Sequence, residues 1–263
     1  MNRSSPPIVL TISGHDPSGG AGIQADIESI FSQGCQACSV ITALTVQNSL
    51  DIQEITPQPA EIFSKQLATV MSDIKPAVIK IGLIGSVEIA NALHEQLKDC
   101  SIPIILDPVL ASGTGTELAD KALTEAIQAK LFPITKLITP NSIEAKRLAP
   151  NNKSLDECGV ELLNFGCEQV LITGAHEESQ TVDNRLYYEG KWQETFSWDR
   201  LPHSYHGSGC TLASSIAALL ARGLPLFAAI NEAQDFTWQA LENGFRPGKG
   251  QHFPNRFFWA TDE

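Results

Sequence analysis

The strongest constraint on the fold is an alternation, along the chain, of continuous apolar segments and segments with helical periodicity. The apolar segments have the length of strands and lie at residues 7–13, 38–44, 77–81, 102–106, 136–139 and 169–173. Strands that are apolar throughout, separated by amphipathic helices, are typical of a parallel sheet covered by helices on both faces. The sequence therefore predicts an α/β fold of three layers around a central, mostly parallel sheet.

The remaining segments complete the predicted order of elements. Apolar residues at helical spacing predict helices at residues 21–31, 60–74, 86–98, 208–222 and 225–242. A short strand is predicted at 51–56, and the alternating residues on either side of Glu189-Gly190 predict a small β-hairpin over 181–198. The chain shows no internal repeat and no linker rich in Pro, Gly or Ser, so we expect one domain over residues 1–263.

Composition and charge exclude several classes of function. The 263 residues carry a formal net charge of −12, which repels phosphate-rich polymers and makes nucleic acid an unsuitable partner. The longest apolar runs are far shorter than the roughly 20 residues of a membrane-spanning helix. The first residues also lack the apolar stretch of a signal peptide. We therefore expect no membrane association and a cytoplasmic location.

The six cysteines do not have the spacing of a metal site. Cys35 and Cys38 form a CxxC pair, but no second pair has matching spacing. Five of the six cysteines are predicted to be small buried or half-buried core residues. Cys210 differs because it follows a glycine-rich turn.

The turn after the first predicted strand is rich in glycine. Residues 13–22 read SGHDPSGGAG, and such a turn lets the backbone approach a ligand closely before a helix begins. Ligands of open parallel sheets bind at the carboxyl ends of the strands, where this turn lies. Its spacing is not that of the dinucleotide-binding GxGxxG motif. By itself the segment is equally compatible with a mobile turn.

Polar residues follow two other predicted strands. Asp107 comes directly after residues 102–106, where it can hold a metal ion, bind a ligand hydroxyl or make a local turn. Asn141 and Glu144 follow residues 136–139 with the spacing of a helix capping box. The same two side chains can instead face a water-coordinated Mg²⁺, which prefers oxygen ligands.

The most informative segment is residues 206–210, HGSGC, which we call the anion loop. It precedes a long apolar helix, and the unpaired N–H groups and dipole of a helix N-terminus bind anions. The segment is not a Walker A loop, because no GxxxxGK string occurs. Ser208 is alternatively an ordinary N-cap. At a helix N-terminus Cys210 is expected to have a lowered thiol pKa, suited to accepting a proton from a substrate hydroxyl.

Five segments in this order resemble a known family of enzymes. They are GGAGIQAD at 19–26, VITALTVQN at 40–48, DPV at 107–109, TPNSIE at 139–144 and HGSGCT at 206–211. Together they resemble the hydroxymethylpyrimidine/phosphomethylpyrimidine kinases of thiamin biosynthesis, members of the ribokinase-like superfamily. The resemblance extends from Leu10 to about Gly223.

The resemblance implies a three-layer ribokinase-like fold with helices on both faces of the sheet. It also implies ATP-dependent phosphorylation of the hydroxymethyl group of 4-amino-5-hydroxymethyl-2-methylpyrimidine, followed by phosphorylation of the resulting monophosphate. ATP would be the co-substrate and Mg²⁺ the cofactor.

The same resemblance assigns roles to individual residues of this chain. The pyrimidine-binding residues are Asp26, Gln47, Gly14, Gly82 and Val109. The ATP-binding residues are Asn141, Thr173 and His206, and the residues at Mg²⁺ are Asp107 and Glu144. The catalytic residues around the transferring phosphoryl group are Gly207, Ser208, Gly209 and Cys210, with Cys210 at the position of an aspartate base in related sugar kinases.

The chain departs from the family pattern on the phosphate side. Thr173 stands where the family carries a lysine, and residues 110–115 also lack a lysine that is often present. His15 and Pro17 replace small polar residues of the first loop. The missing lysines bear mainly on an already phosphorylated substrate, so phosphorylation of the monophosphate is the less supported of the two steps.

Two alternatives remain open at this point. A pyridoxal kinase shares the fold, ATP and a hydroxymethyl acceptor, although Gln47 and Cys210 favour a pyrimidine. A non-catalytic pyrimidine-binding protein is the other alternative, motivated by the missing lysines. Exposed hairpin strands additionally suggest a homodimer.

Overall fold

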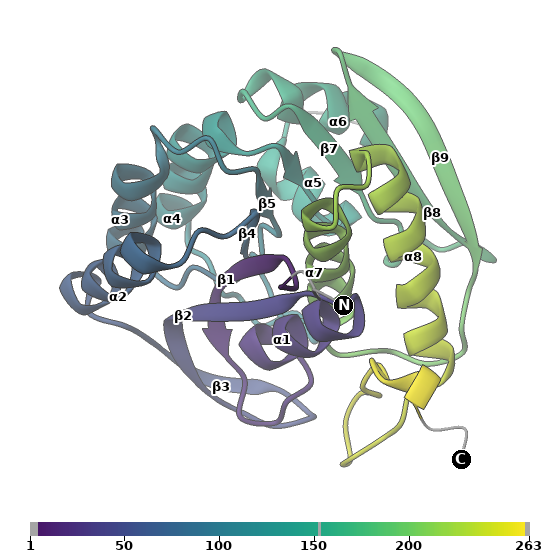
Figure 1. Ribbon diagram of the computed structural model, residues 1–263. Helices are drawn as coiled ribbons and strands as arrows, with labels where there is room; N and C mark the ends of the chain where they lie inside the picture. Colours follow the sequence, from purple (N-terminus) through teal and green to yellow (C-terminus); the bar gives the residue numbers. More distant parts are fainter. Residues whose placement is uncertain (1–4, 152–153, 261–263) are drawn as a thin grey trace.

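The structure, a computed structural model, describes residues 5–151 and 154–260. Within these residues a nine-stranded sheet has the strand order β3-β2-β1-β4-β5-β6-β7-β8-β9 (Figure 1). The strands are β1 (Ile8–His15), β2 (Gln36–Gln47), β3 (Ile52–Pro57), β4 (Val78–Ile81), β5 (Ile104–Leu106), β6 (Leu137–Ile138), β7 (Gln169–Ile172), β8 (Thr181–Tyr188) and β9 (Lys191–Asp199). The six strands from β2 to β7 in this order are parallel, which confirms the predicted mostly parallel sheet.

Antiparallel strands complete both edges of the sheet. β3 pairs with β2 at one edge, and β8 and β9 follow β7 at the other. The predicted hairpin therefore forms, but it extends the main sheet instead of standing apart as a small unit. Glu189 and Gly190 have φ values of 52° and 75°, as a two-residue turn with the twist of a hairpin requires.

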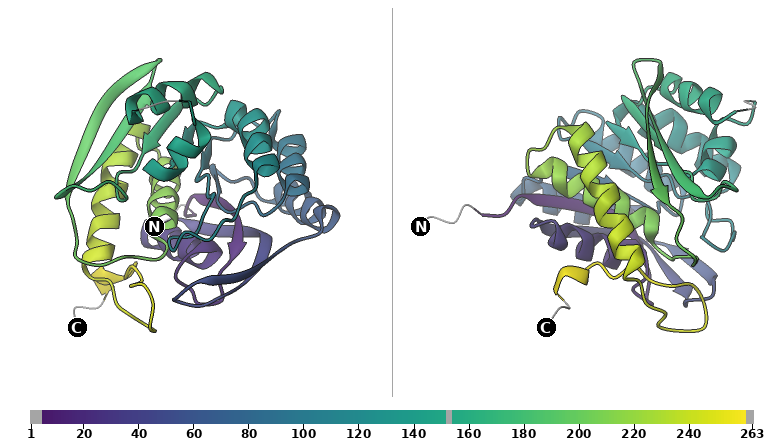
Figure 2. Two further views of the ribbon diagram at one scale, coloured as in Figure 1. Left: turned by 180° about the vertical axis from the view of Figure 1, so that it is seen from behind. Right: turned by 90° about the vertical axis from the view of Figure 1, so that its right-hand side faces the viewer.

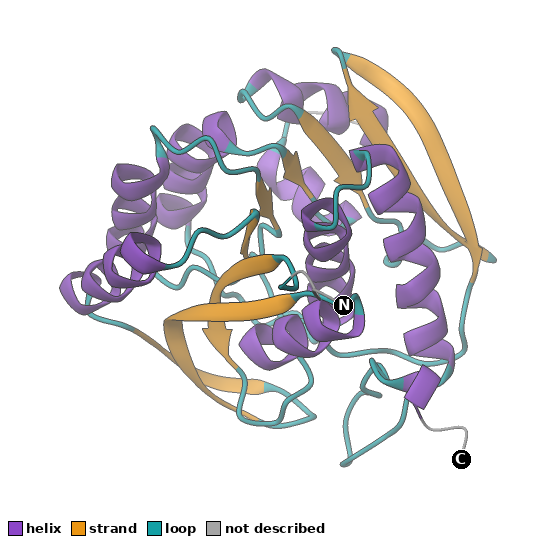
Figure 3. Ribbon diagram, in the orientation of Figure 1, coloured by secondary structure: helices purple, strands orange, loops and turns teal. Residues whose placement is uncertain are grey.

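Helices cover both faces of the sheet (Figures 2 and 3). They are α1 (Gly22–Ser32), α2 (Ala60–Asp73), α3 (Val87–Leu97), α4 (Lys121–Ala126), α5 (Ser142–Leu148), α6 (Leu155–Asn164), α7 (Ser208–Ala221) and α8 (Leu226–Glu242). The helices predicted at 21–31, 60–74, 86–98, 208–222 and 225–242 are confirmed. α4 and α6 lie outside the predicted helices, because six and ten residues contain too few helical repeats to be distinctive. None of the helices within the described ranges is both long and apolar enough to cross a membrane.

Two apolar cores lie on opposite faces of the sheet. In β1, Leu10 and Ile12 pack into one core, and Val9 packs into the other. β4 repeats the pattern with Ile79 and Val78. This division follows from the strand geometry, because successive side chains point to opposite faces. The central parallel strands β1, β4, β5, β6 and β7 are thus buried on both sides, which is why their sequences are nearly continuously apolar, whereas β2 is partly exposed.

The parallel arrangement also decides where a ligand can bind. The carboxyl ends of β1, β4, β5, β6 and β7 lie at the same edge of the sheet. The loops that follow these strands therefore come together there. The N-terminus of α7 joins them at a common cavity.

Candidate active site

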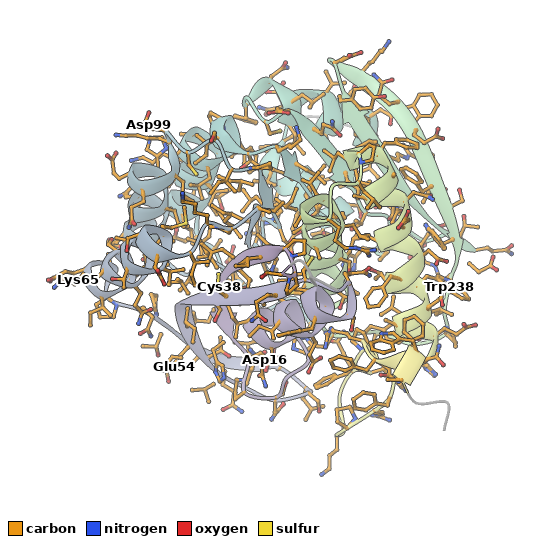
Figure 4. All side chains as sticks on the ribbon, in the orientation of Figure 1. Asp16, Cys38, Glu54, Lys65, Asp99 and Trp238 are labelled. Carbon is orange, nitrogen blue, oxygen red and sulfur yellow. The ribbon has the colours of Figure 1, made fainter. Side chains whose placement is uncertain are left out.

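A cavity of about 590 Å³ opens at this edge of the sheet. Its walls come from the loop after β1, from the loops after β5, β6 and β7, from the first turn of α7 and from α8. Two of its residues, Asp16 and Trp238, are labelled in Figure 4. The predicted site residues that line it are Gly14, Gln47, Asp107, Val109, Asn141, Glu144, Thr173, His206, Gly207, Ser208, Gly209 and Cys210. The structure therefore brings twelve of the fourteen predicted residues together.

Asp26 is not part of the cavity lining and is completely buried. Its Oδ2 accepts a hydrogen bond from Thr11 Oγ1 at 2.6 Å, and its Oδ1 lies 2.7 Å from Lys80 Nζ and also accepts from Ser214 Oγ. Both carboxylate oxygens thus have protein partners. The contact of Asp26 with the pyrimidine stays a prediction, and the structure gives Asp26 a role as the buried partner of Lys80, Thr11 and Ser214.

Lys80 is a residue that the motifs do not indicate. It lies in β4 between isoleucines and is fully buried. Burial by itself lowers the pKa of Lys80, but the neighbouring negative charges, that of Asp26 foremost, and the hydrogen bond to Asp26 together outweigh this effect, and the pKa is raised. A lysine within an apolar strand is a usable sequence signal, because a buried ammonium group requires a paired charge.

Gly82 also lies outside the lining of the cavity, beside Lys80. A Cβ atom at Gly82 would be 2.5 Å from Ser13 Oγ and 2.7 Å from Lys80 Nζ. The missing side chain therefore leaves room for the lysine ammonium group. A direct contact of Gly82 with the substrate ring stays a prediction.

Two buried carboxyl groups, Asp107 and Glu144, lie in the cavity wall. Burial is the main cause that raises the pKa of Asp107 to about 6 and that of Glu144 to about 8, and the charge of Asp107 raises the latter further. The hydroxyl of Thr139, also in the wall, is buried and has no hydrogen-bond partner among the described residues. Two buried carboxyl groups and a hydroxyl beside them are oxygen donors of the kind that Mg²⁺ binds.

Asn141 and Glu144 also form the predicted capping box of α5. Asn141 Oδ1 accepts hydrogen bonds from the N–H groups of Ile143 and Glu144, and Glu144 Oε2 accepts one from the Asn141 N–H. Glu144 Oε1 also accepts the Leu110 N–H at 3.2 Å. These bonds fix the glutamate carboxylate in the cavity wall, so the capping role and a metal-binding role are compatible.

The anion loop adopts the geometry expected of an anion site. Gly207 is the N-cap of α7 with φ of +83°, and no side chain within residues 5–151 and 154–260 caps the helix. Ser208 is the first residue of the helix, so its alternative role as an ordinary N-cap is not supported. The N–H groups of the first helical turn therefore lack a capping side chain, and their residues line the cavity.

The expected lowering of the Cys210 pKa is wrong. Burial of the thiol is the main cause that raises its pKa to about 12. The positive charge of Lys80 acts to lower the pKa, and the negative charges of Asp26 and Asp107 act to raise it. Removal of water from a thiolate outweighs the helix N-terminus here. Cys210 therefore carries a neutral thiol at neutral pH. All six cysteines are free, and the five outside the anion loop are buried or half-buried, as predicted.

Asp16 and His206 are linked beside the anion loop. His206 Nε2 lies 2.8 Å from Asp16 Oδ2, which also accepts the Ala21 N–H at 2.9 Å. Burial acts to raise the pKa of Asp16, but the hydrogen bonds from His206 and Ser18 outweigh it and the pKa is lowered. The glycine-rich turn after β1 is thus held against the anion loop. The family resemblance assigns His206 to ATP binding, and the sequence motifs do not indicate Asp16.

Comparison with known proteins identifies the family. A family model described as phosphomethylpyrimidine kinase matches residues 16–255. A hydroxymethylpyrimidine/phosphomethylpyrimidine kinase of Streptomyces coelicolor is 34% identical over 264 residues, covering 98% of this chain and 97% of the relative. The enzyme of that name from Salmonella typhimurium is 37% identical over 251 residues, covering 92% of this chain and 94% of the relative.

Solved structures agree with this relationship. An ADP complex of Bacillus subtilis pyridoxal kinase superposes with a TM-score of 0.90 at 26% identity, covering 98% of this chain and all of the other. A phosphomethylpyrimidine kinase from Clostridium difficile has a TM-score of 0.78 at 31% identity, covering 89% of this chain and 99% of the other. The resemblance drawn from the five sequence segments is therefore confirmed. The chain belongs to the phosphomethylpyrimidine kinase family and is an ATP-using kinase with a ribokinase-like α/β fold.

Proposed function

We propose that the protein transfers the γ-phosphoryl group of ATP to the hydroxymethyl group of 4-amino-5-hydroxymethyl-2-methylpyrimidine in thiamin biosynthesis. The proposal rests above all on one cavity that joins Gln47, a pair of buried carboxyl groups and the anion loop. Phosphoryl transfer requires positioning and electrostatic stabilisation more than covalent catalysis, and this cavity offers both.

Gln47 supports an aminopyrimidine as the acceptor. Its Nε2 donates to Thr45 Oγ1 at 2.5 Å, and its Oε1 is buried with no hydrogen-bond partner in the part of the chain that the structure describes. An unpaired buried amide oxygen is unfavourable, and the exocyclic amino group of the substrate is a donor that would pair with it. Gly14 and Val109 lie in the same cavity and would contact the ring.

Asp107 and Glu144 are the residues that would hold Mg²⁺, with the Thr139 hydroxyl and water as further ligands. When bound, Mg²⁺ would neutralise charge on the transferring phosphate oxygens. The N–H groups of Ser208, Gly209 and Cys210 would bind the same oxygens. Asn141, Thr173 and His206 would contact ATP. Cys210 could accept the hydroxyl proton only as a thiolate, which is the minor form at neutral pH because its pKa is raised to about 12, so this role rests on the family resemblance alone.

The cavity supports the first phosphorylation more strongly than the second. Among the described residues that line it there is no lysine, and Thr173 stands at the end of β7. Arg200 lines it, but its guanidinium donates to the carbonyls of Ala175 and Glu177 at 2.8 and 2.7 Å. A phosphorylated acceptor would therefore lack a free arginine or lysine partner. We expect turnover of the monophosphate to be the slower step.

Pyridoxal is the second candidate substrate, because the Bacillus subtilis pyridoxal kinase superposes with the higher TM-score of the two neighbours described above. Its ring lacks the amino group that would pair with Gln47 Oε1. The Gln47→Ala variant therefore separates the two substrates. It should raise KM for the pyrimidine and leave KM for pyridoxal nearly unchanged.

We further propose that the protein is a homodimer, but through the edge of the sheet formed by β2 and β3 in place of the hairpin strands β8 and β9 at the opposite edge. Leu44 and Val46 of β2 are 46% and 51% exposed. Neighbouring exposed apolar side chains near a sheet edge are typical of a surface that another protein chain covers. Light scattering coupled to size-exclusion chromatography measures the mass directly. A mass near 28.4 kDa would contradict the dimer. The cytoplasmic location stays a prediction.

A steady-state assay with ATP and Mg²⁺ tests the proposed function. Hydroxymethylpyrimidine, its monophosphate and pyridoxal are compared by kcat/KM under the same conditions. Hydroxymethylpyrimidine should lead, followed by its monophosphate. A higher kcat/KM for pyridoxal than for hydroxymethylpyrimidine would identify pyridoxal as the preferred substrate. Binding of the pyrimidine without turnover would support the non-catalytic alternative.

A further inference from the structure

Arg256 lies behind the anion loop, although it is close to the C-terminus of the chain. Its side chain is almost completely buried, with an exposed fraction of 2% for the residue. The guanidinium donates to Thr211 Oγ1 at 2.9 Å, to the Gly20 carbonyl at 2.5 Å and to Glu28 at 3.0 Å. One side chain therefore joins α7, the glycine-rich turn after β1 and α1.

Thr211 connects Arg256 to the anion loop. Its hydroxyl accepts the hydrogen bond from Arg256 Nε and donates its own proton to the Gly207 carbonyl at 2.8 Å. The Thr211 N–H donates to the same carbonyl at 3.0 Å. Because the hydroxyl has one proton, the bond from Arg256 directs that proton to Gly207.

The Gly207 carbonyl and the Ser208 N–H belong to one peptide plane. In a trans peptide these two groups point in opposite directions, so a carbonyl held towards Thr211 turns the Ser208 N–H away from it. Ser208 lines the cavity. The bonds to Gly207 therefore direct the first N–H of α7 to the side where a phosphate would bind.

Close packing around Gly207 supports this orientation of its peptide group. A Cβ atom at Gly207 would lie 1.9 Å from the Gly20 carbonyl oxygen and 2.9 Å from Arg256 Nη2. The two loops and the guanidinium thus touch without intervening space. Loss of the guanidinium would release the Gly20 carbonyl and the Thr211 hydroxyl together.

We propose that Arg256 is a positioning residue for phosphoryl transfer, acting through Thr211 to orient the Ser208 amide of the anion loop. It does not touch the substrate. The inference rests on the proposed kinase function and adds to it a residue outside the five family segments. Glu28, which also binds the guanidinium, anchors it on the side of α1 and is not required for the orientation.

The test compares Thr211→Val, which is nearly isosteric and lacks the hydroxyl, with Thr211→Ser, which keeps it. Thr211→Val should lower kcat by at least about tenfold, as loss of one donor to a developing anion does, with pyrimidine KM changed less than about twofold. Thr211→Ser should recover most of that loss. Arg256→Met should resemble Thr211→Val, and the double variant should be no slower than the slower single variant, because both act on one relay.

Three controls separate positioning from stability and from the choice of substrate. Glu28→Gln should retain kcat within about threefold, and Arg256→Lys should not restore it, because one ammonium group cannot span both acceptors. In ¹⁵N NMR spectra the Ser208 amide signal should shift on addition of AMP-PCP in the wild type and Thr211→Ser, but not in Thr211→Val. Equal kcat values and equal NMR responses for the two Thr211 variants would overturn the inference. The NMR comparison decides it even if the pyrimidine proves not to be the substrate, an outcome that would count against the proposed function alone.

Discussion

Lys80 and Asp26 form an ion pair in which neither side chain reaches solvent. The two residues come from β4 and α1, 54 positions apart in the chain. Such a pair contributes little net stability compared with apolar residues of the same volume, but removal of one partner leaves a buried unpaired charge. The sequence motif suggests that Asp26 binds the ligand, whereas in the structure Asp26 provides the counter-charge of the buried Lys80.

We therefore expect Asp26→Asn to lower the free energy of unfolding by about 3–5 kcal/mol, because Lys80 stays buried without its counter-charge. Urea denaturation measures the change. Thr11→Val, which removes one hydrogen bond to the same carboxylate, should cost only about 1.5–3 kcal/mol. The double change Asp26→Leu with Lys80→Met should recover much of the loss. An Asp26→Asn protein of normal stability with a raised pyrimidine KM would support the direct ligand contact instead.

The thiol of Cys210 gives a second prediction at the residue scale. Its raised pKa means that alkylation by iodoacetamide should be much slower at pH 7.5 than for an ordinary thiol, whose pKa is about 8.5. The rate should still be rising at about pH 10, since the group titrates near 12. Mass spectrometry locates the alkylated cysteine.

Asp107→Asn is the matched variant for this measurement. It removes one of the negative charges that raise the Cys210 pKa, so alkylation should become faster at pH 7.5. An alkylation rate that already levels off between pH 7 and 8 in the wild type would contradict the raised pKa and support the lowered pKa expected from the helix N-terminus.

At the scale of elements, the start of α7 determines the site. The helix begins at a glycine in the left-handed region, and its first turn lacks a capping side chain. The left-handed conformation brings Gly207 against the Gly20 carbonyl, where a side chain does not fit. The glycine is required both for its φ angle and for the close approach of the two loops.

Gly207→Ala should therefore be much more damaging than a glycine substitution at the other end of the helix. Gly223 follows α7 with φ of +92°, and a Cβ atom added there would have open space around it, so Gly223→Ala should cost only about 1–2 kcal/mol for the left-handed backbone. Gly207→Ala adds a backbone clash. We expect a larger loss of stability and a kcat lowered by about 100-fold, the effect of misplacing catalytic groups by an ångström. Equal effects of the two variants in urea denaturation and kinetics would refute this account.

At the scale of the whole molecule, the buried carboxyl groups make stability depend on pH. The folded-state pKa values of Asp107 and Glu144, about 6 and about 8, lie above their unfolded values of about 4. Between these values the folded protein binds more protons than the unfolded chain. Stability contributed by the two groups is therefore present at low pH and is lost as the pH rises through the folded-state pKa values.

The ligand-free protein should accordingly lose stability between about pH 5 and pH 8, with a contribution of up to about 1.4 kcal/mol per pH unit from each titrating group. Urea denaturation at several pH values measures the slope, and Glu144→Gln should reduce it. Mg²⁺ should stabilise the wild type more at pH 8 than at pH 6, because the metal competes with protons for the carboxylates. An unchanged slope in Glu144→Gln would show that this group is ionised throughout.

Much of the fold follows from local patterns in the sequence. The parallel strands, five helices and the turns that carry the site were predictable because strand periodicity, helix periodicity and turn chemistry each depend on a few adjacent residues. The anion loop and the capping box of α5 are of the same kind. Twelve of the predicted site residues consequently line one cavity.

Only the tertiary structure decides which charges meet. Lys80 pairs with Asp26, burial raises the Cys210 pKa that the local motif suggests is lowered, and Arg256 reaches a carbonyl 236 positions away at Gly20. Desolvation and Coulomb interactions depend on distance in space and on exclusion of water. The strand order and the return of the chain after α8 set both quantities. A local sequence pattern can therefore indicate a phosphate-binding loop, but the charge of its cysteine and the support of its amides come from distant residues.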